Sequence, residues 1–172
     1  MIKKTLYFMQ IALSLLAPLI LTASSLAETY TTWETMEVDK CASAWLIKRF
    51  IDKAAVFKFI PKGDLVKEGI PFDTPDSEFR RYHNMSTYES ILKKYQIKDS
   101  SLIHIGKIMH DIEVNYWSEK VITESQKIQE EIQEIISSTR DPTECLKKTF
   151  PIFDEIYRHI KSESKTANPD YS

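Results

Sequence analysis

The sequence predicts an α+β fold: a small sheet with a βαβ-like N-terminal unit, followed by a mostly helical C-terminal half. The first observation is that residues 29–36 and 55–61, both rich in β-branched and aromatic side chains, flank a segment with the apolar spacing of a helix. The second is that apolar residues recur at helical intervals, behind capping residues, from residue 86 onward. A strand, a helix and a strand within about thirty residues favour two neighbouring strands of one sheet.

The first 27 residues have the pattern of a secretory signal. Lys3 and Lys4 precede an almost uninterrupted apolar run over residues 6–21, and Ser25-Leu26-Ala27 is a small-x-small cleavage site. An uncleaved membrane anchor is the alternative, because this segment is about long enough to span a bilayer. We expect the protein to be exported, periplasmic or secreted, and to meet a membrane only through this segment if it is not cleaved.

Length and composition bound the remainder of the chain. With 172 residues there is material for one domain, so we expect a signal peptide at residues 1–27, a single domain at residues 28–161 and a flexible polar tail at residues 162–172. The formal net charge is −2, and it is −4 without the two signal lysines, which argues against nucleic acid as a partner. With three glycines in all, a nucleotide-binding loop is excluded in practice. The sequence does not indicate an oligomeric state.

The only cysteines, Cys41 and Cys145, leave two alternatives open. In an oxidising compartment they can form a disulfide that closes a loop of about a hundred residues, worth ~4 kcal/mol on the chain-entropy argument. Two separately buried thiols are equally compatible with the sequence, because it contains no distance between them.

Residues 39–52 combine apolar and charged residues more densely than any other stretch, and we interpret them as one helix with two unlike faces. Asp39 is the expected N-cap. Trp45 lies off the apolar arc, near Arg49 and Asp52 at spacings that bring side chains together along a helix. An indole among charges requires either a covering element or a ligand. We expect Arg49 to pair with Asp52 or with that ligand.

The segments that follow are assigned by the same signals. Pro61 ends the second strand, and the prolines of residues 70–75 favour an edge or an extended crossing. Residues 78–83 alternate as in a half-exposed strand. Helices are expected at residues 88–95, capped by Ser86 or Thr87, at 100–112, capped by Asp99, at 119–138, and over 146–160, where Pro151 predicts two helices or a kink.

His110, Asp111 and Glu113 form the most suggestive chemical group. His110 and Glu113 share one helical face at i, i+3, a spacing that places an imidazole and a carboxylate on one metal ion or one proton path. The simpler interpretation is a solvated acidic helix end with a half-buried histidine. A divalent metal ion (zinc, manganese or iron) is the cofactor that this group would hold.

Arg80, Arg81 and His83 form the most basic patch of the mature chain. Their side chains are suited to charge-assisted hydrogen bonds to an oxyanion. An edge strand made soluble by charge is the alternative interpretation, and it accounts for the same residues equally well.

These segments together resemble the chromate-resistance exported protein family, whose domain also forms the C-terminal part of the chromate-responsive regulator ChrB. Residues 39–52 read Asp-Lys-Cys-Ala-Ser-Ala-Trp-Leu-Ile-Lys-Arg-Phe-Ile-Asp, similar to the family's Asp-Arg-Ile-Ala-Ser-Ala-Trp-Leu-Ile-Arg-Arg-Phe-Ile-Asp. Further family-like pieces follow in order at residues 56–61, 71–73, 88–89 and 108–113. The resemblance runs from residue 33 to about residue 160 and implies a role in chromate or heavy-metal resistance.

The departures from the family pattern limit what the resemblance implies. Arg81 and Ser86 stand where the family tends to have histidine and cysteine, and Glu113 stands where it has aspartate. A thiolate metal site is therefore not expected. The resemblance does not extend to the DNA-binding region of the regulator, so it does not imply regulation.

The leading hypothesis is an exported accessory protein of chromate or heavy-metal resistance that binds an oxyanion or a divalent metal in a cleft. Trp45 with Arg49 would form one wall, residues 80–83 the second, and His110, Asp111 and Glu113 the third. One alternative is a metal-dependent periplasmic enzyme, a hydrolase or oxidoreductase, with His110 and Glu113 as ligand and base. Another is an interaction protein whose isoleucine-rich helix, residues 121–136, packs on a partner.

Overall fold

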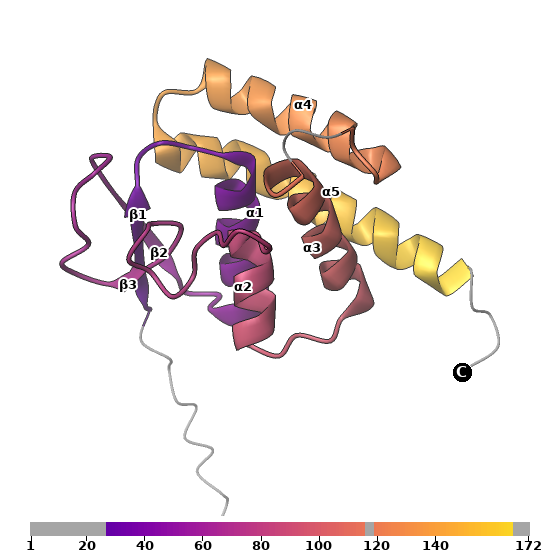
Figure 1. The fold of residues 1–172 in the computed structure, drawn as a ribbon, viewed down its shortest axis with the longest axis horizontal. Coiled ribbons are helices and arrows are strands. Elements are labelled where there is room, and N and C mark those ends of the chain that lie inside the picture. The colour runs from indigo at the N-terminus through magenta and orange to yellow at the C-terminus, as the bar shows by residue number, and fades with distance from the viewer. Residues whose placement is uncertain (1–26, 116–118, 167–172) are drawn as a thin grey trace, which may run out of the picture.

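The computed structural model describes residues 27–115 and 119–166. The predicted signal peptide, apart from residue 27, and the last six residues of the predicted tail lie outside these ranges. Within them, a small sheet lies at one end of the molecule and α4 and α5 run across the other elements (Figure 1). The elements are β1 (Thr29–Trp33), α1 (Val38–Leu46), the π-helix η1 (Ile47–Ile51), β2 (Val56–Ile60), β3 (Ile70–Pro71), α2 (Thr87–Lys94), α3 (Ser100–Glu113), α4 (Thr123–Ser138) and α5 (Pro142–Thr166).

The described strands form one parallel sheet in the order β2-β1-β3. Thr29 pairs with Val56 and Trp33 with Ile60, so β1 and β2 are neighbours joined through α1. This confirms the predicted α+β class and the βαβ-like unit. Because all three strands run the same way, their carboxyl ends meet at one edge of the sheet.

The centre of the fold is α1. Every residue from Val38 to Ile47 is buried, and α1 packs against α2, α3 and α5. The predicted division into an apolar arc and a charged face is therefore wrong, because a helix covered on all sides buries its polar residues as well. The regular helix also ends earlier than expected: η1 begins at Ile47, and the N–H of Asp52 donates to the carbonyl of Ile47 at 2.8 Å.

The helical C-terminal half follows the prediction closely where local signals act. Ser86 caps α2 in a full capping box with Glu89. Asp99 caps α3 by accepting hydrogen bonds from the N–H groups of Ser101 and Leu102. None of the described helices is long and apolar enough to cross a membrane.

One expectation about local structure was wrong. Residues 78–83 do not form a regular strand; only two isolated bridges occur there, Phe79 opposite Phe72 and Tyr82 opposite Met85. The final helix, α5, runs through Pro151 as one element from Pro142 to Thr166, so the expected alternative of two separate helices is excluded.

Candidate functional site

A pocket of about 400 Å³ lies at the carboxyl ends of the parallel strands. The segments after β1, β2 and β3 and the first turn of α1 each contribute to its wall. Open parallel sheets bind ligands outside this edge, where connecting loops diverge. We call it the strand-end pocket; it is lined by Trp33, Thr35, Glu37, Asp39, Lys40, Lys62, Asp73, Thr74, Pro75, Arg80, Arg81 and Glu113.

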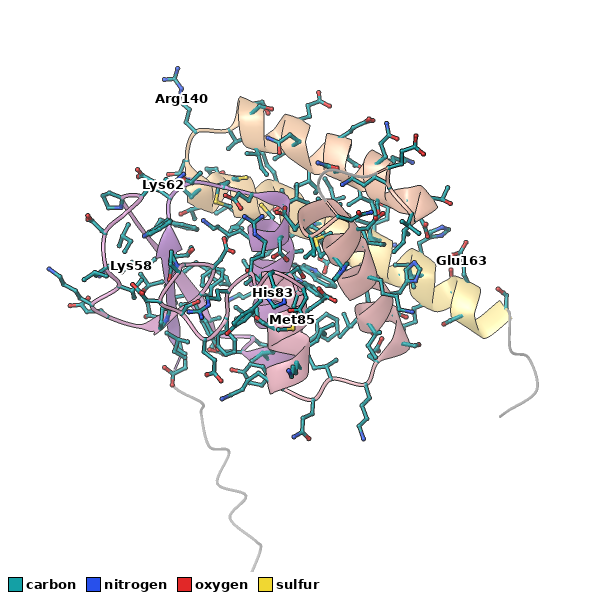
Figure 2. All side chains as sticks on the ribbon, in the orientation of Figure 1. Lys58, Lys62, His83, Met85, Arg140 and Glu163 are labelled. Carbon is teal, nitrogen blue, oxygen red and sulfur yellow. The ribbon has the colours of Figure 1, made fainter. Side chains whose placement is uncertain are left out.

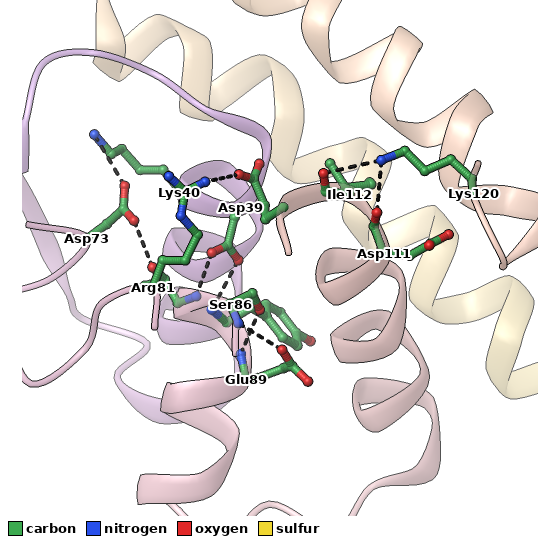
Figure 3. A network of polar contacts seen from close by, with 12 residues as sticks. Asp39, Lys40, Asp73, Arg81, Ser86, Glu89, Asp111, Ile112 and Lys120 are labelled. Atoms are coloured by element: carbon green, nitrogen blue, oxygen red, sulfur yellow. Dashed lines mark hydrogen bonds and ion pairs between the residues drawn. The ribbon is translucent and has the colours of Figure 1, made fainter. Parts of the chain in front are cut away.

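A buried ammonium group lies at the base of the strand-end pocket. Lys40 is 2% exposed, and its Nζ donates to the carbonyl oxygens of Trp33, at 2.9 Å, and Thr35. The carboxylate of Asp73 lies 3.4 Å from the same nitrogen (Figure 3). A buried charge requires such partners, since desolvation costs several kcal/mol per ion. Lys40 therefore ties the end of β1 to the segment after β3.

Asp39 serves a different element from the one expected. It does not cap α1, whose N-cap position is Glu37 without a side-chain hydrogen bond. Its two carboxylate oxygens accept the backbone N–H groups of Thr87, at 2.6 Å, and Tyr88, at 3.0 Å, in the first turn of α2 (Figure 3). Burial raises the pKa of Asp39 well above its usual range, and the nearby Asp73 carboxylate adds to this effect. The first turn of α1 is thereby joined to the start of α2.

Asp73 lies just past the end of β3 in a left-handed backbone conformation, with φ of 52°. This conformation is uncommon for residues other than glycine, and aspartate tolerates it better than most. Oδ1 accepts the hydroxyl of Thr87 at 2.7 Å. Burial raises the pKa of Asp73, although Lys40 opposes the shift. Backbone strain at such a position is typical of functional sites.

The open side of the strand-end pocket carries exposed positive charge. Arg81, whose side chain is 51% exposed, donates to the mostly buried Glu113 at 2.8 Å. Arg80 donates to the carbonyl of Pro75, and its guanidinium lies 4.9 Å from the ring centroid of Tyr82. Burial, and next the charge of a neighbouring glutamate, raises the pKa of Glu113. Both arginines retain N–H groups that these contacts do not use.

The ion pair of Arg81 and Glu113 joins two of the three walls predicted from the sequence, the one at residues 80–83 and the one at residues 110–113. Trp45 and Arg49, the third wall, do not belong to this pocket. Trp45 is fully buried, and its indole N–H donates to Asp154 of α5 at 2.7 Å. Arg49 binds the same carboxylate through two hydrogen bonds of 2.9 Å, so the expected pairing of Arg49 with Asp52 is wrong.

Asp52 has a local role instead. Its carboxylate accepts the backbone N–H groups of Glu28 and Ala54 and so closes the connection between η1 and β2. His83 is exposed in the loop before α2 and does not line the strand-end pocket (Figure 2). The basic patch therefore contributes two arginines to the pocket without the histidine.

The predicted metal group is divided among separate partners. His110 contacts Glu89 through Nδ1 at 2.9 Å, whereas Glu113 binds Arg81. The Asp111 carboxylate accepts hydrogen bonds from the backbone N–H groups of Val121 and Ile122, just before α4, so it binds neither His110 nor Glu113. No group of three histidine, cysteine or acidic side chains suited to a metal ion occurs within residues 27–115 and 119–166. The residues present do not fit the expected metal site.

The pKa of Asp111 reflects its hydrogen bonds. Burial alone would raise it, but hydrogen bonds from the Asn115 amide and from the N–H groups of Ile122 and Val121 lower the pKa to about 2. In addition, Lys120 donates to the Asp111 carbonyl at 2.8 Å (Figure 3). The carboxylate therefore holds the chain that leads into α4.

Sequence reasoning did not name three charged residues of the strand-end pocket as site residues: Asp39 and Lys40, which are buried, and Asp73, whose side chain is largely buried. The available signal was topological. Once three parallel strands are expected, the polar residues that follow each strand gather at one edge of the sheet. Asp73 comes shortly after β3, and Asp39 and Lys40 lie in the first turn of α1, the element that follows β1.

Comparison with known proteins provides a family match. The family described as "ChrB, C-terminal domain" matches residues 30–160. A curated relative, Protein ChrB of Cupriavidus metallidurans, is 28% identical over 87 residues, which cover 49% of this chain and 27% of the relative. The match thus spans about a quarter of that protein's length. No solved structure matched the chain.

Proposed function

The chain belongs to the ChrB C-terminal domain family, which is linked to chromate resistance, and from this premise we propose that it binds a small oxyanion in the strand-end pocket. Chromate is the anion that the family suggests. The observation that carries the proposal is the arrangement of Lys62, Arg80 and Arg81 around a pocket at the carboxyl ends of the strands. Guanidinium groups bind tetrahedral oxyanions through paired, charge-assisted hydrogen bonds.

The internal contacts of the pocket favour an anion over a divalent metal. Lys40 supplies a positive charge among the carboxylates, and Asp39 already accepts two backbone N–H groups. A metal ion would have to displace these donors. An oxyanion needs only the spare N–H groups of Arg80 and Arg81, together with the ammonium of Lys62.

We also propose that the protein acts outside the cytoplasm as an accessory factor in chromate resistance. The support for this is the signal-like pattern of residues 1–27, with its lysines, apolar run and small-residue cleavage site. Capture of the anion in that compartment would lower its free concentration.

Isothermal titration of the purified protein with sodium chromate and with sodium sulfate tests the proposal. Sulfate has the same shape and charge but is not an oxidant, so it separates binding from redox chemistry. We expect binding of both anions, and a loss of about ten- to a hundredfold in affinity in Arg81→Ala, because a hydrogen bond to a charged group contributes ~1.5–3 kcal/mol.

Arg158→Ala is the matched control, since Arg158 is exposed on α5 and does not line the pocket. Its affinity should stay within twofold of the wild type. An absence of heat with both anions at micromolar protein would contradict the proposal, as would equal losses in the two arginine variants. Heat with zinc or manganese that disappears on chelation would favour the metal alternative instead.

A further inference from the structure

A second hollow of the surface lies between α4 and α5, apart from the strand-end pocket. The short connection at residues 139–141 turns the chain back, so the first half of α4 lies beside the second half of α5 (Figure 1). We call the hollow between these two halves the α4–α5 groove. Its volume is about 580 Å³.

The floor of the α4–α5 groove consists of isoleucines from three helices: Ile108 of α3, Ile128 of α4, and Ile152, Ile156 and Ile160 of α5. The three isoleucines of α5 are only half-buried. They follow one another at intervals of four residues, so they form one row of about 12 Å along the helix. A row of this length matches two turns of a partner helix, whose apolar side chains recur every three or four residues.

The rim of the groove is acidic on both sides. Glu124 and Glu131 line it from α4, and Glu155 lines it from α5. The lining also contains Lys127 and His159, so the glutamates are in excess. Glu131 and Glu155 are exposed, and neither forms an ion pair within residues 27–115 and 119–166. Their charges are therefore available to a partner.

The charge of the rim distinguishes between occupants of the groove. Two copies of the chain that met groove to groove would bring these glutamates against one another, and like charges oppose such pairing. An anionic lipid surface is opposed for the same reason. Lysine or arginine side chains beside an apolar helix face would instead meet opposite charges on both sides of the groove.

We propose that the α4–α5 groove binds an amphipathic helix of another protein, with leucine or isoleucine on one face and lysine or arginine at the edges of that face. The apolar face would cover the isoleucine floor, and the basic side chains would pair with Glu131 and Glu155. None of the described residues lines both this groove and the strand-end pocket. The inference therefore does not depend on oxyanion binding.

Fluorescence anisotropy of labelled synthetic peptides tests the proposal on the purified protein. The probe is a helix of leucine and lysine in amphipathic order, with about 14 residues or four turns. A second peptide has the same composition in an order without an apolar face, and a third has glutamate in place of lysine. We expect the protein to bind the probe at least about tenfold more tightly than either of the other peptides.

Charge reversal in the protein locates the binding site. The double variant Glu131→Lys, Glu155→Lys should weaken binding of the leucine–lysine probe by about five- to tenfold, and it should strengthen binding of the leucine–glutamate peptide. Glu130→Lys is the matched control, because Glu130 is exposed next to Glu131 on α4 but does not line the groove. Its affinity for the probe should stay within about twofold of the wild type. Circular dichroism should show the same fold in all variants, since the three positions are exposed.

No binding of the probe to the wild type would overturn the proposal, as would equal losses in Glu130→Lys and in the double variant. Equal affinity for the two leucine–lysine peptides would also overturn it, because charge alone would then explain the binding. A dimer in sedimentation that the double variant loses would identify a second copy as the occupant. Cosedimentation with vesicles of phosphatidylglycerol and phosphatidylcholine that the double variant loses would identify a lipid surface. Either of these results would contradict the assignment to a helix of another protein.

Discussion

Replacement of Asp154 by alanine tests how α5 holds α1. Its carboxylate accepts the indole N–H of Trp45 and two N–H groups of Arg49. Loss of the carboxylate leaves a fully buried indole donor without a partner, which costs about 1–3 kcal/mol. The Arg49 side chain is 40% exposed, so its ion pair contributes only about 0.2–1 kcal/mol. We expect Asp154→Ala to lower the free energy of unfolding by about 1–4 kcal/mol.

Urea denaturation followed by tryptophan fluorescence and circular dichroism measures this difference. Asp154→Asn retains one acceptor oxygen for the indole, so it should cost less than half as much. Glu155→Ala, at an exposed position next in the chain, is the matched control and should stay within about 0.5 kcal/mol of the wild type.

A double-mutant cycle separates the indole from the arginine. Trp45→Phe removes the N–H donor. The loss of unfolding free energy caused by Asp154→Ala should therefore be smaller in the Trp45→Phe background than in the wild type, by at least about 1 kcal/mol. Equal costs in the two backgrounds would refute the reasoning that Asp154 acts mainly as the partner of a buried indole.

Two further predictions concern pH and backbone geometry. Because the pKa of Glu113 is raised in the folded state, its contribution to stability is complete below the unfolded pKa of about 4.3 and is lost as pH rises through the folded value. In Glu113→Gln the unfolding free energy should therefore fall less steeply with pH above pH 4 than in the wild type, by at most about 1.4 kcal/mol per pH unit. Urea denaturation at a series of pH values from 4 to 8 measures this slope, and the same slope in both proteins would contradict the prediction. Gly69→Ala should cost about 2 kcal/mol or more, since φ is 81° and a Cβ would lie 2.6 Å from the Thr29 carbonyl oxygen. Gly63→Ala, with φ of 96° and open space around it, should cost only about 1 kcal/mol, and equal losses in urea melts would refute the steric argument.

The features that could be predicted from the sequence were those set by neighbouring residues. The caps at Ser86 and Asp99 act over two or three positions, and both were confirmed. The βαβ-like unit followed from a strand, a helix and a strand in close succession, and the parallel pairing of β1 with β2 confirmed it. The family assignment was also confirmed, because it depends on ordered segments along the chain.

The candidate site could be predicted only in part because its contacts join distant segments. Asp39 meets α2 across about fifty positions, and helical spacing contains no information about that partner. The shared helical face of His110 and Glu113 was a sound local inference, but the two side chains reach different neighbours, Glu89 and Arg81. Arg81 and Glu113 were each named as candidates, and their direct pairing required the tertiary structure.

The contacts made by the first turn of α1 limit which insertions and deletions the chain can accept near this helix. Asp39 and Lys40 are consecutive, yet Asp39 contacts α2 and Lys40 contacts the segment after β3. A one-residue insertion or deletion that shifts the register of α1 would rotate both side chains by about 100° and move them by about 1.5 Å along the helix axis. No single repacking could restore two contacts that point in different directions. Length variation in this family should therefore be confined to connections such as residues 61–69, and the spacing between Trp33 and Asp39 should be invariant.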